Sequence, residues 1–577
     1  MRKVFFLLLF VAFAQLPAFA DVDLKTGDFH VRYADIDYAG VKGAVIDRTY
    51  NSASQTVGLF GYGWTSVYET KLYVIGDGNI LVKEVGSSCK TCAENGSGNA
   101  SILIREKGFF ELFFTPREPD QAKTDLAVNQ LIPLLIRDRK LENSPVAIAK
   151  KRKELLASMS QRAAEWITYT EKGWLTPVAL PAQSKWFSTN GELQSIDLKD
   201  NTFTRYYNDK SYESFNAQGF LQNKYDYKGK LVYEITYTAN KISQITDGAG
   251  NVFKFQLNSK GLVTAIQANK DKATFEYNAA NCLVKSVSPE KVSRTYTYDA
   301  RNIMTGIKEP ENKIAITYDP RTSRVTSTTE DEDEDAETIT YRYSKLLKED
   351  GSIDPYRFAT TKIRTYASGE YGDSTYNEYE LREILGRPYT YKTIITDNNY
   401  TTETVFTECG CGPLSIRKGG SYANFKYDGK SRMIQKDNGE YLLNATYNDD
   451  QNKISRIERT DKETDEVQVT EYFYSPDGDL IKMQSKDIVI ELAYDANRNI
   501  VKMNAPEAIL HFKYNSINKP IEILMDNVGS IQVLYDDKGE IEKVESPEGH
   551  TMSLKVTQAF QELLTLAKPQ GFDYKLR

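Results

Sequence analysis

Large apolar side chains alternate with polar ones in short segments through the second half of the chain. Tyr233, Ile235 and Tyr237 form one such set, separated by Glu234 and Thr236. Because successive side chains of a β-strand point to opposite faces, this period of two predicts strands that bury one face only. Asp or Asn and then Gly or Asn follow these segments, and such residues are typical of tight turns.

A tyrosine closes these segments at a regular interval of about twenty residues. The repeat-defining residues are Tyr237, Tyr277, Tyr298, Tyr318, Tyr427, Tyr447, Tyr474, Tyr494, Tyr514 and Tyr535, and Leu257 stands at one further position. A fixed period indicates one supersecondary unit repeated. We expect each unit to be a β-hairpin, and consecutive hairpins to form an antiparallel strip that curls, spirals or closes to hide its apolar face. We interpret the tyrosines as structural, because neighbouring hairpins pack on such a ladder.

The strand that follows each turn departs from simple alternation. Its apolar residues lie three apart, at Ile242 and Ile245 and again at Ile541 and Val544. A β-bulge, which adds one residue to a strand, is one explanation for this spacing.

A different pattern lies between residues 116 and 172, where Gly is scarce and Ala, Leu, Lys, Glu and Arg are common. Apolar residues at helical spacing predict a helical hairpin, divided near residues 143–145, inserted into a mainly β fold. The acidic run Glu330–Asp335 is expected to be an exposed loop tip. The expected organisation is a signal peptide over 1–20, a β-rich opening over 21–115, the helical insertion over 116–172, a first repeat block over 173–343, a β-rich segment without the regular repeat over 344–426, a second repeat block over 427–555, and a tail over 556–577.

The first twenty residues have the pattern of a secretory signal. Arg2 and Lys3 precede an apolar stretch, and Ala18 and Ala20 form a small-x-small cleavage site. We therefore expect a secreted, periplasmic or cell-surface protein with no transmembrane segment in the mature chain, since no later stretch is long enough. The net charge of −7 and the pI near 5.5 exclude a general nucleic-acid binder.

Five cysteines exclude a disulfide-rich scaffold in a chain of 577 residues. In an exported protein, the simplest interpretation is a local disulfide between Cys89 and Cys92. A zinc site built from these two with Cys409 and Cys411 is an alternative, because zinc favours four thiolates. We assign no metal and no cofactor.

No motif for hydrolytic, nucleotide-binding or metalloprotease chemistry appears around the three histidines or elsewhere. Paired carboxylates for glycoside hydrolysis leave no signature in local spacing, so a glycan-active enzyme stays an alternative. We nevertheless expect a protein without catalytic residues.

Units that read Tyr-Asp/Asn-x-x-Gly/Asn-x-Leu/Ile at this period resemble the YD repeats of the RHS family. The matching units include Tyr298-Asp299, Tyr427-Asp428, Tyr494-Asp495 and Tyr535-Asp536 with Gly539. The opening is similar to the domain that precedes such repeats in bacterial RHS proteins, through Thr26-Gly27, Arg48-Thr49-Tyr50-Asn51-Ser52 and Gly61-Tyr62-Gly63-Trp64. The resemblance implies a β-strip wound into a hollow shell.

Toxin members of this family enclose a C-terminal toxic domain and carry an Asp-Pro-x-Gly-Leu signature for self-cleavage. Asp319-Pro320 and Asp354-Pro355 lack the following Gly-Leu. The first hypothesis is therefore an exported, non-enzymatic scaffold that binds cell-wall glycan, a cell surface or a protein partner. The second is part of a shell for a toxin carried on another chain.

Overall fold

A computed structural model describes the chain from residue 19 onward, with gaps. The described residues are 19–38, 44–85, 109–118, 120–176, 178–189, 194–332, 335–384, 387–397, 399–408, 412–486, 488–506, 508–515, 519–535, 541–547, 556, 558, 559, 561, 565 and 568–576. The predicted signal peptide, except for its last two residues, lies outside them, as do Cys89, Cys92, Cys409 and Cys411.

One antiparallel sheet of 36 strands runs from β7 to β42, and each strand pairs with the next along the chain. It begins with β7 (Lys71–Val74), β8 (Ile80–Val85) and β9 (Phe109–Thr115). The first repeat block holds β10 (Lys185–Ser188), β11 (Ser195–Lys199), β12 (Thr202–Tyr206), β13 (Tyr212–Phe215), β14 (Leu221–Tyr225), β15 (Leu231–Thr238), β16 (Lys241–Asp247), β17 (Val252–Leu257), β18 (Val263–Ala268), β19 (Asp271–Tyr277), β20 (Leu283–Val287), β21 (Ser293–Tyr298), β22 (Met304–Lys308), β23 (Asn312–Tyr318) and β24 (Val325–Glu332). This confirms the predicted mainly β fold of repeated antiparallel hairpins.

Four longer strands follow and form what we call the arm. They are β25 (Asp335–Leu347), β26 (Ile353–Tyr366), β27 (Tyr371–Ile384) and β28 (Arg387–Thr396). The segment expected to lack the regular repeat therefore holds the longest strands of the sheet. The acidic run lies at the end of the hairpin β24–β25, where Glu332 pairs with Asp335. Glu330 and Asp331 are exposed as expected, but they belong to a strand, and residues 333 and 334 lie outside the described residues.

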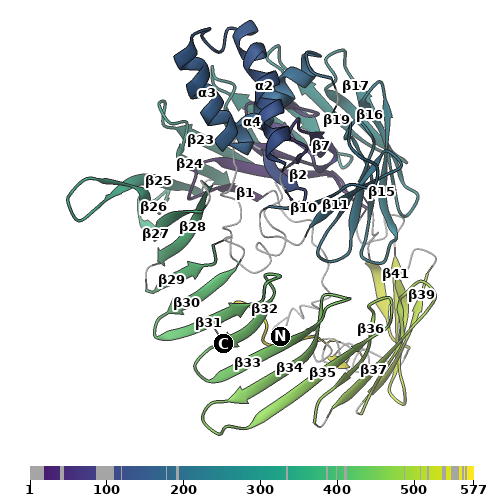
Figure 1. The fold of residues 1–577 in the computed structure, drawn as a ribbon. Coiled ribbons are helices and arrows are strands. Elements are labelled where there is room, and N and C mark those ends of the chain that lie inside the picture. Colours follow the sequence, from purple (N-terminus) through teal and green to yellow (C-terminus); the bar gives the residue numbers. More distant parts are fainter. Residues whose placement is uncertain are drawn as a thin grey trace.

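The sheet then continues through a second repeat block, which we begin at Thr401, before the predicted boundary at residue 427. Its strands are β29 (Thr401–Phe406), β30 (Pro413–Lys418), β31 (Ser421–Tyr427), β32 (Met433–Asp437), β33 (Tyr441–Asn448), β34 (Lys453–Asp461), β35 (Val467–Tyr474), β36 (Leu480–Gln484), β37 (Val489–Tyr494), β38 (Ile500–Ala505), β39 (Ala508–Tyr514), β40 (Pro520–Met525), β41 (Gly529–Tyr535) and β42 (Ile541–Glu545). Figure 1 shows the strip wound as one broad coil, from β15 over β23, down past β29 and under β34, so that β41 lies below β15.

The spacing of three between apolar residues comes from a β-bulge, as predicted. Tyr237 pairs with Ile242 and Thr236 pairs with Gln244, so Ser243 is the extra residue. The bulge lets Ile242 and Ile245 both turn inward and become buried. The same register shift lies at Tyr447 and at Tyr535.

A small separate sheet lies inside the first block. It is made by β1 (Phe19–Val22), β2 (Phe29–Ile36), β3 (Ile46–Asn51) and β6 (Trp64–Thr65), next to the pair β4 (Val57–Gly58) and β5 (Gly61–Tyr62) and the 3-10 turn η1 (Val67–Glu69). We call residues 19–70 the insert. Its apolar side chains share one core with the inward residues of β8 to β25, and Figure 1 shows the backbone of β2 inside the first block.

Three helices cover the outer face of β8. They are α2 (Gln121–Arg137), α3 (Pro145–Ala157) and α4 (Met159–Glu171). Ile80 and Val82 point to the insert, whereas Leu81 between them packs on the helices. Gly76 is required in this contact, because a Cβ there would lie 2.2 Å from the Trp166 ring.

The second predicted helix is divided into α3 and α4 at Ser158. The backbone of Ser158 is extended, and its hydroxyl accepts a hydrogen bond from the N–H of Gln161 at 3.2 Å. Ser158 therefore caps a new helix instead of continuing the preceding one. No helix in the described part of the chain is both long enough and apolar enough to cross a membrane.

Candidate functional site

The repeat tyrosines join each hairpin to the one before it. In most units, the tyrosine hydroxyl donates a hydrogen bond to a backbone carbonyl at the bulge of the preceding hairpin. The pairs are Tyr237–Leu221, Tyr277–Val263, Tyr298–Leu283, Tyr343–Val325, Tyr427–Pro413, Tyr447–Met433, Tyr474–Ile454, Tyr494–Leu480, Tyr514–Ile500 and Tyr535–Pro520, at 2.7 to 2.9 Å. We call this series the tyrosine ladder. This geometry explains why the repeat position is a tyrosine. Phe has no hydrogen-bond donor, and a shorter polar side chain would not reach the carbonyl of the preceding hairpin.

Two positions depart from the expected set. Tyr343 is a member that sequence reasoning missed, because no Asp or Asn follows it and the acidic hairpin lengthens its unit. Tyr318 bonds to no backbone carbonyl that we find among the described residues, and its hydroxyl is buried. At this point, the insert supplies Tyr50, whose hydroxyl accepts from the N–H of Met304 at 2.8 Å.

Arg48 fixes the insert to the wall of the first block. Its Nε donates to Oδ2 of Asp35 at 2.8 Å, and its Nη2 donates to Ser286 Oγ at 2.9 Å and Tyr296 OH at 3.0 Å. The guanidinium also lies over the Trp64 ring, 4.4 Å from its centroid. A fully buried arginine is tolerated here because carboxylate, hydroxyls and aromatic faces surround it.

The Gly-x-Gly-Trp motif of the opening is part of the same contact. Trp64 Nε1 donates to the hydroxyl of the ladder residue Tyr298 at 3.1 Å. The N–H of Tyr62 donates to the carbonyl of Asn281 at 2.9 Å. A Cβ at Gly61, where φ is +98°, would lie 2.5 Å from that carbonyl, so only glycine fits. The motif that identified the opening therefore docks it into the repeats.

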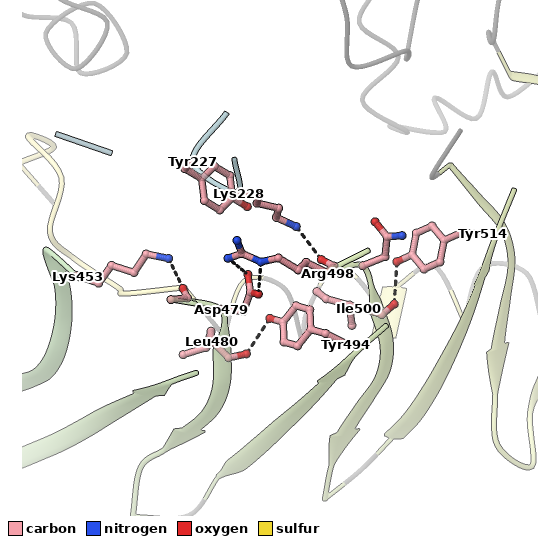
Figure 2. A pocket seen from close by; sticks show the side chains of 11 residues that line it. Tyr227, Lys228, Lys453, Asp479, Leu480, Tyr494, Arg498, Ile500 and Tyr514 are labelled. Atoms are coloured by element: carbon pink, nitrogen blue, oxygen red, sulfur yellow. Dashed lines mark hydrogen bonds and ion pairs between the residues drawn. The ribbon is translucent and has the colours of Figure 1, made fainter. Parts of the chain in front are cut away.

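The two edges of the wound strip meet at a seam, shown in Figure 2. Lys228 Nζ, in the turn before β15, donates to the carbonyl of Arg498 at 2.7 Å, across 270 residues of sequence. Lys230 Nζ reaches the carbonyl of Asn497 at 2.6 Å. Arg498 Nε is held in turn by Oδ2 of Asp479 at 2.6 Å. The strip therefore returns to its own edge after one turn.

An open pocket of about 280 Å³ lies at the seam. Its wall includes Tyr227, whose ring lies 5.7 Å from Lys453 Nζ and 5.9 Å from the Arg498 guanidinium carbon. Burial lowers the pKa of Lys453, while Asp479 opposes that shift. The cations that line it are engaged within the wall, Lys228 and Lys453 by backbone carbonyls and Arg498 by Asp479. Its geometry therefore supports closure of the coil more than chemistry on a ligand.

Cys89, Cys92, Cys409 and Cys411 lie outside the described residues. The disulfide between Cys89 and Cys92 and the alternative zinc site therefore stay predictions. Cys282 is a buried free thiol. Within the described ranges, His, Cys, Asp and Glu side chains nowhere gather in threes to hold a metal ion. The absence of a cofactor stays a prediction.

Two family models match this chain. Residues 20–90 match one described as "Domain of unknown function (DUF6531)", and residues 418–576 match one described as "Teneurin YD-shell". The first match covers the insert and the start of the main sheet, and the second covers most of the second repeat block. No curated protein sequence matches the chain.

Several solved structures show a likeness at low identity. The crystal structure of TcdB2-TccC3 without its hypervariable C-terminal region has 10% identity and a TM-score of 0.37, with 91% of this chain and 27% of that one covered. The Photorhabdus luminescens Tc holotoxin pore has 12% identity and a TM-score of 0.31, with coverage of 63% and 21%. The chain thus spans about a quarter of the length of these structures.

Removal of one ladder hydroxyl should weaken the second block. In Tyr494→Phe, the Leu480 carbonyl loses its 2.7 Å donor, so we expect a loss of about 1–2 kcal/mol in the free energy of unfolding. Urea unfolding followed by tyrosine fluorescence measures this change. Tyr371→Phe is the matched control, because Tyr371 is 81% exposed. Equal effects of the two substitutions would contradict a ladder that stabilises the wall.

Glu69 should make the insert sensitive to pH. Burial raises the pKa of Glu69 to about 7 from 4.5, although the N–H groups of Leu59 and Ser66, both at 2.8 Å, oppose the rise. Protonation of Glu69 in the folded state therefore raises the free energy of unfolding. This contribution is fully present below pH 4.5 and is lost as the pH rises through about 7. The difference is at most about 3 kcal/mol.

Thermal unfolding between about pH 4.5 and pH 8 tests this titration. We expect the wild-type Tm to fall across this range relative to that of Glu69→Gln, which has no titrating group at this position. If the Tm of the two proteins changed with pH in the same way, Glu69 would not be the group that makes the stability of the insert depend on pH.

Proposed function

Because this chain is an RHS-type YD-repeat protein built as a wound β-shell, we propose that it is an exported, non-enzymatic scaffold that binds glycan through its arm. Export is supported by the predicted signal sequence ending near Ala20. The observation that carries the proposal is a cleft on the arm, where an exposed tyrosine lies among charged side chains. The wall then serves to present the arm.

The inside of the first block favours a binding role for the outer surface. Arg48, Trp64 and Tyr50 of the insert are fully or almost fully buried against the wall. A cargo in the first block would have to displace this core and leave a buried cation without its partners. The second hypothesis, a shell for a toxin on another chain, is therefore the weaker one for this part of the molecule.

The arm differs from the rest of the sheet in length and exposure. The hairpin β25–β26 extends away from the wall in Figure 1. Five large apolar or aromatic side chains are exposed along β25 to β27. They are Leu347, Ile353, Tyr356, Tyr366 and Tyr371.

The cleft lies near the turn between β25 and β26 and has a volume of about 480 Å³. Its residues are Lys348, Asp354, Tyr356, Arg357, Glu380, Leu381, Arg382 and Glu383. Tyr356 OH donates to Oε2 of Glu383 at 3.2 Å, so two lining residues of the cleft are joined. Arg382 Nη2 lies 3.4 Å from Oε1 of Glu380.

Mixed donors and acceptors beside one aromatic ring match the chemistry of a sugar. Hydroxyl groups donate to carboxylates and accept from guanidinium groups, and the apolar face of a pyranose packs on a tyrosine ring. The three cations of the cleft are balanced by its three carboxylates, so a polyanion gains no net attraction there, and an apolar ligand would leave these charges desolvated. We propose binding without turnover, because Glu380 and Glu383 are each engaged by a neighbouring side chain.

Co-sedimentation with insoluble cell-wall glycan tests this function. We expect the full chain to sediment with the glycan, and Tyr356→Ala to lower the affinity at least about tenfold through loss of the stacking face. Tyr366→Ala is the matched control, because Tyr366 and Tyr356 are 45% and 44% exposed and Tyr366 stands at the other end of β26, outside the cleft. Equal loss in both variants, or no sedimentation of the wild type, would refute the glycan site.

A further inference from the structure

We propose that the concave face of the second repeat block is a peptide-binding groove, and that residues 568–576 occupy it as an exchangeable ligand. The ligand class is a polypeptide segment with one carboxylate between two aromatic side chains. The groove lies on β31 to β35, away from the arm, so this inference does not rest on the glycan site.

A lysine marks the groove. In the second block, the inward position three residues after the ladder carbonyl is apolar in most hairpins. These residues are Ile416, Ile457, Met483, Met503 and Ile523. At the same position β32 carries Lys436, whose side chain is 2% exposed. Burying a lysine on an apolar face is costly unless an anion meets it there.

The anion comes from residues 568–576. Lys436 Nζ lies 2.9 Å from Oδ1 of Asp573, across 137 residues of sequence. Asp573 is itself 39% exposed, so the sheet supplies the buried half of the pair and the segment supplies the accessible half. This division is that of a receptor and a ligand.

Aromatic residues on both sides of Asp573 complete the contact. The Tyr574 ring meets the Phe425 ring edge to face, with centroids 5.4 Å apart. Phe572 packs against both apolar clusters of the second block, and Leu576 joins Tyr574 on the cluster around Phe425. These side chains pack on the buried apolar residues of the second block.

The segment is held more loosely than the insert. Within the described residues, no β-ladder joins 568–576 to the sheet. Tyr472 OH meets the carbonyl of Lys568 at 3.4 Å, a weak hydrogen bond. Phe572 and Tyr574 are only partly buried, whereas Arg48 of the insert is fully buried. A ligand with one ion pair and a few half-buried anchors can be exchanged without unfolding the wall.

Charge reversal in the full chain tests the groove. In Asp573→Lys, the like charges should release residues 568–576, and we expect their amides to exchange with deuterium at least about tenfold faster. The double variant Lys436→Glu with Asp573→Lys should restore slow exchange, because it re-forms the pair with opposite polarity. A fluorescent peptide with the sequence of residues 568–576 should bind to Asp573→Lys and not to the wild type, whose groove is filled.

Lys426→Glu is the control, since Lys426 lies on the neighbouring strand β31 but faces outward and is exposed. It should leave the exchange of residues 568–576 unchanged. Far-UV circular dichroism checks that each variant keeps its sheet. Unchanged exchange in Asp573→Lys, no rescue in the double variant, or no peptide binding by the released chain would each overturn the proposal.

Discussion

The hydrogen bond from a ladder tyrosine to the carbonyl of the preceding hairpin is the contact on which the wall depends. A β-hairpin alone is barely stable in water, and each hairpin in a strip is stabilised only by contacts with the neighbouring hairpins. In the bonds of Tyr494 to Leu480 and Tyr514 to Ile500, one side chain fixes both the spacing and the tilt of consecutive units. The bulge at each carbonyl supplies the curvature that winds the strip.

A wound strip presents its apolar face to its own interior, so the interior must be filled. The chain fills each block with a segment from outside the repeats, and each filler carries one charge to a polar position in the wall. Arg48 of the insert reaches Ser286 in the first block, and Asp573 reaches Lys436 in the second. Charged contacts of this kind fix one register on a wall that is otherwise repetitive, because apolar contacts alone would fit several hairpins equally.

The hairpin fold was predictable because it depends on local pattern. The alternation of apolar and polar residues, the turn residues and the spacing of Ile242 and Ile245 all lie within a single hairpin. The structure confirms the strip and its bulges. The fillers and the seam were not predictable, because Lys228 meets Arg498 and Lys436 meets Asp573 across 270 and 137 residues. No local pattern reports such contacts. A lysine at an apolar position of the repeat was the one available signal for the groove.

The tyrosine ladder is interrupted in the arm, and the strands are longest there. Between Tyr343 and Tyr427, no tyrosine of the described residues bonds to a carbonyl of the preceding hairpin. Phe406 stands at a bulge where a ladder tyrosine would otherwise be, and it has no hydroxyl to donate. Hairpins without this tie are free to lengthen, since their outer ends need not match the width of the wall. The same repeat therefore builds the shell where its hydroxyl is present and a projecting surface where it is absent.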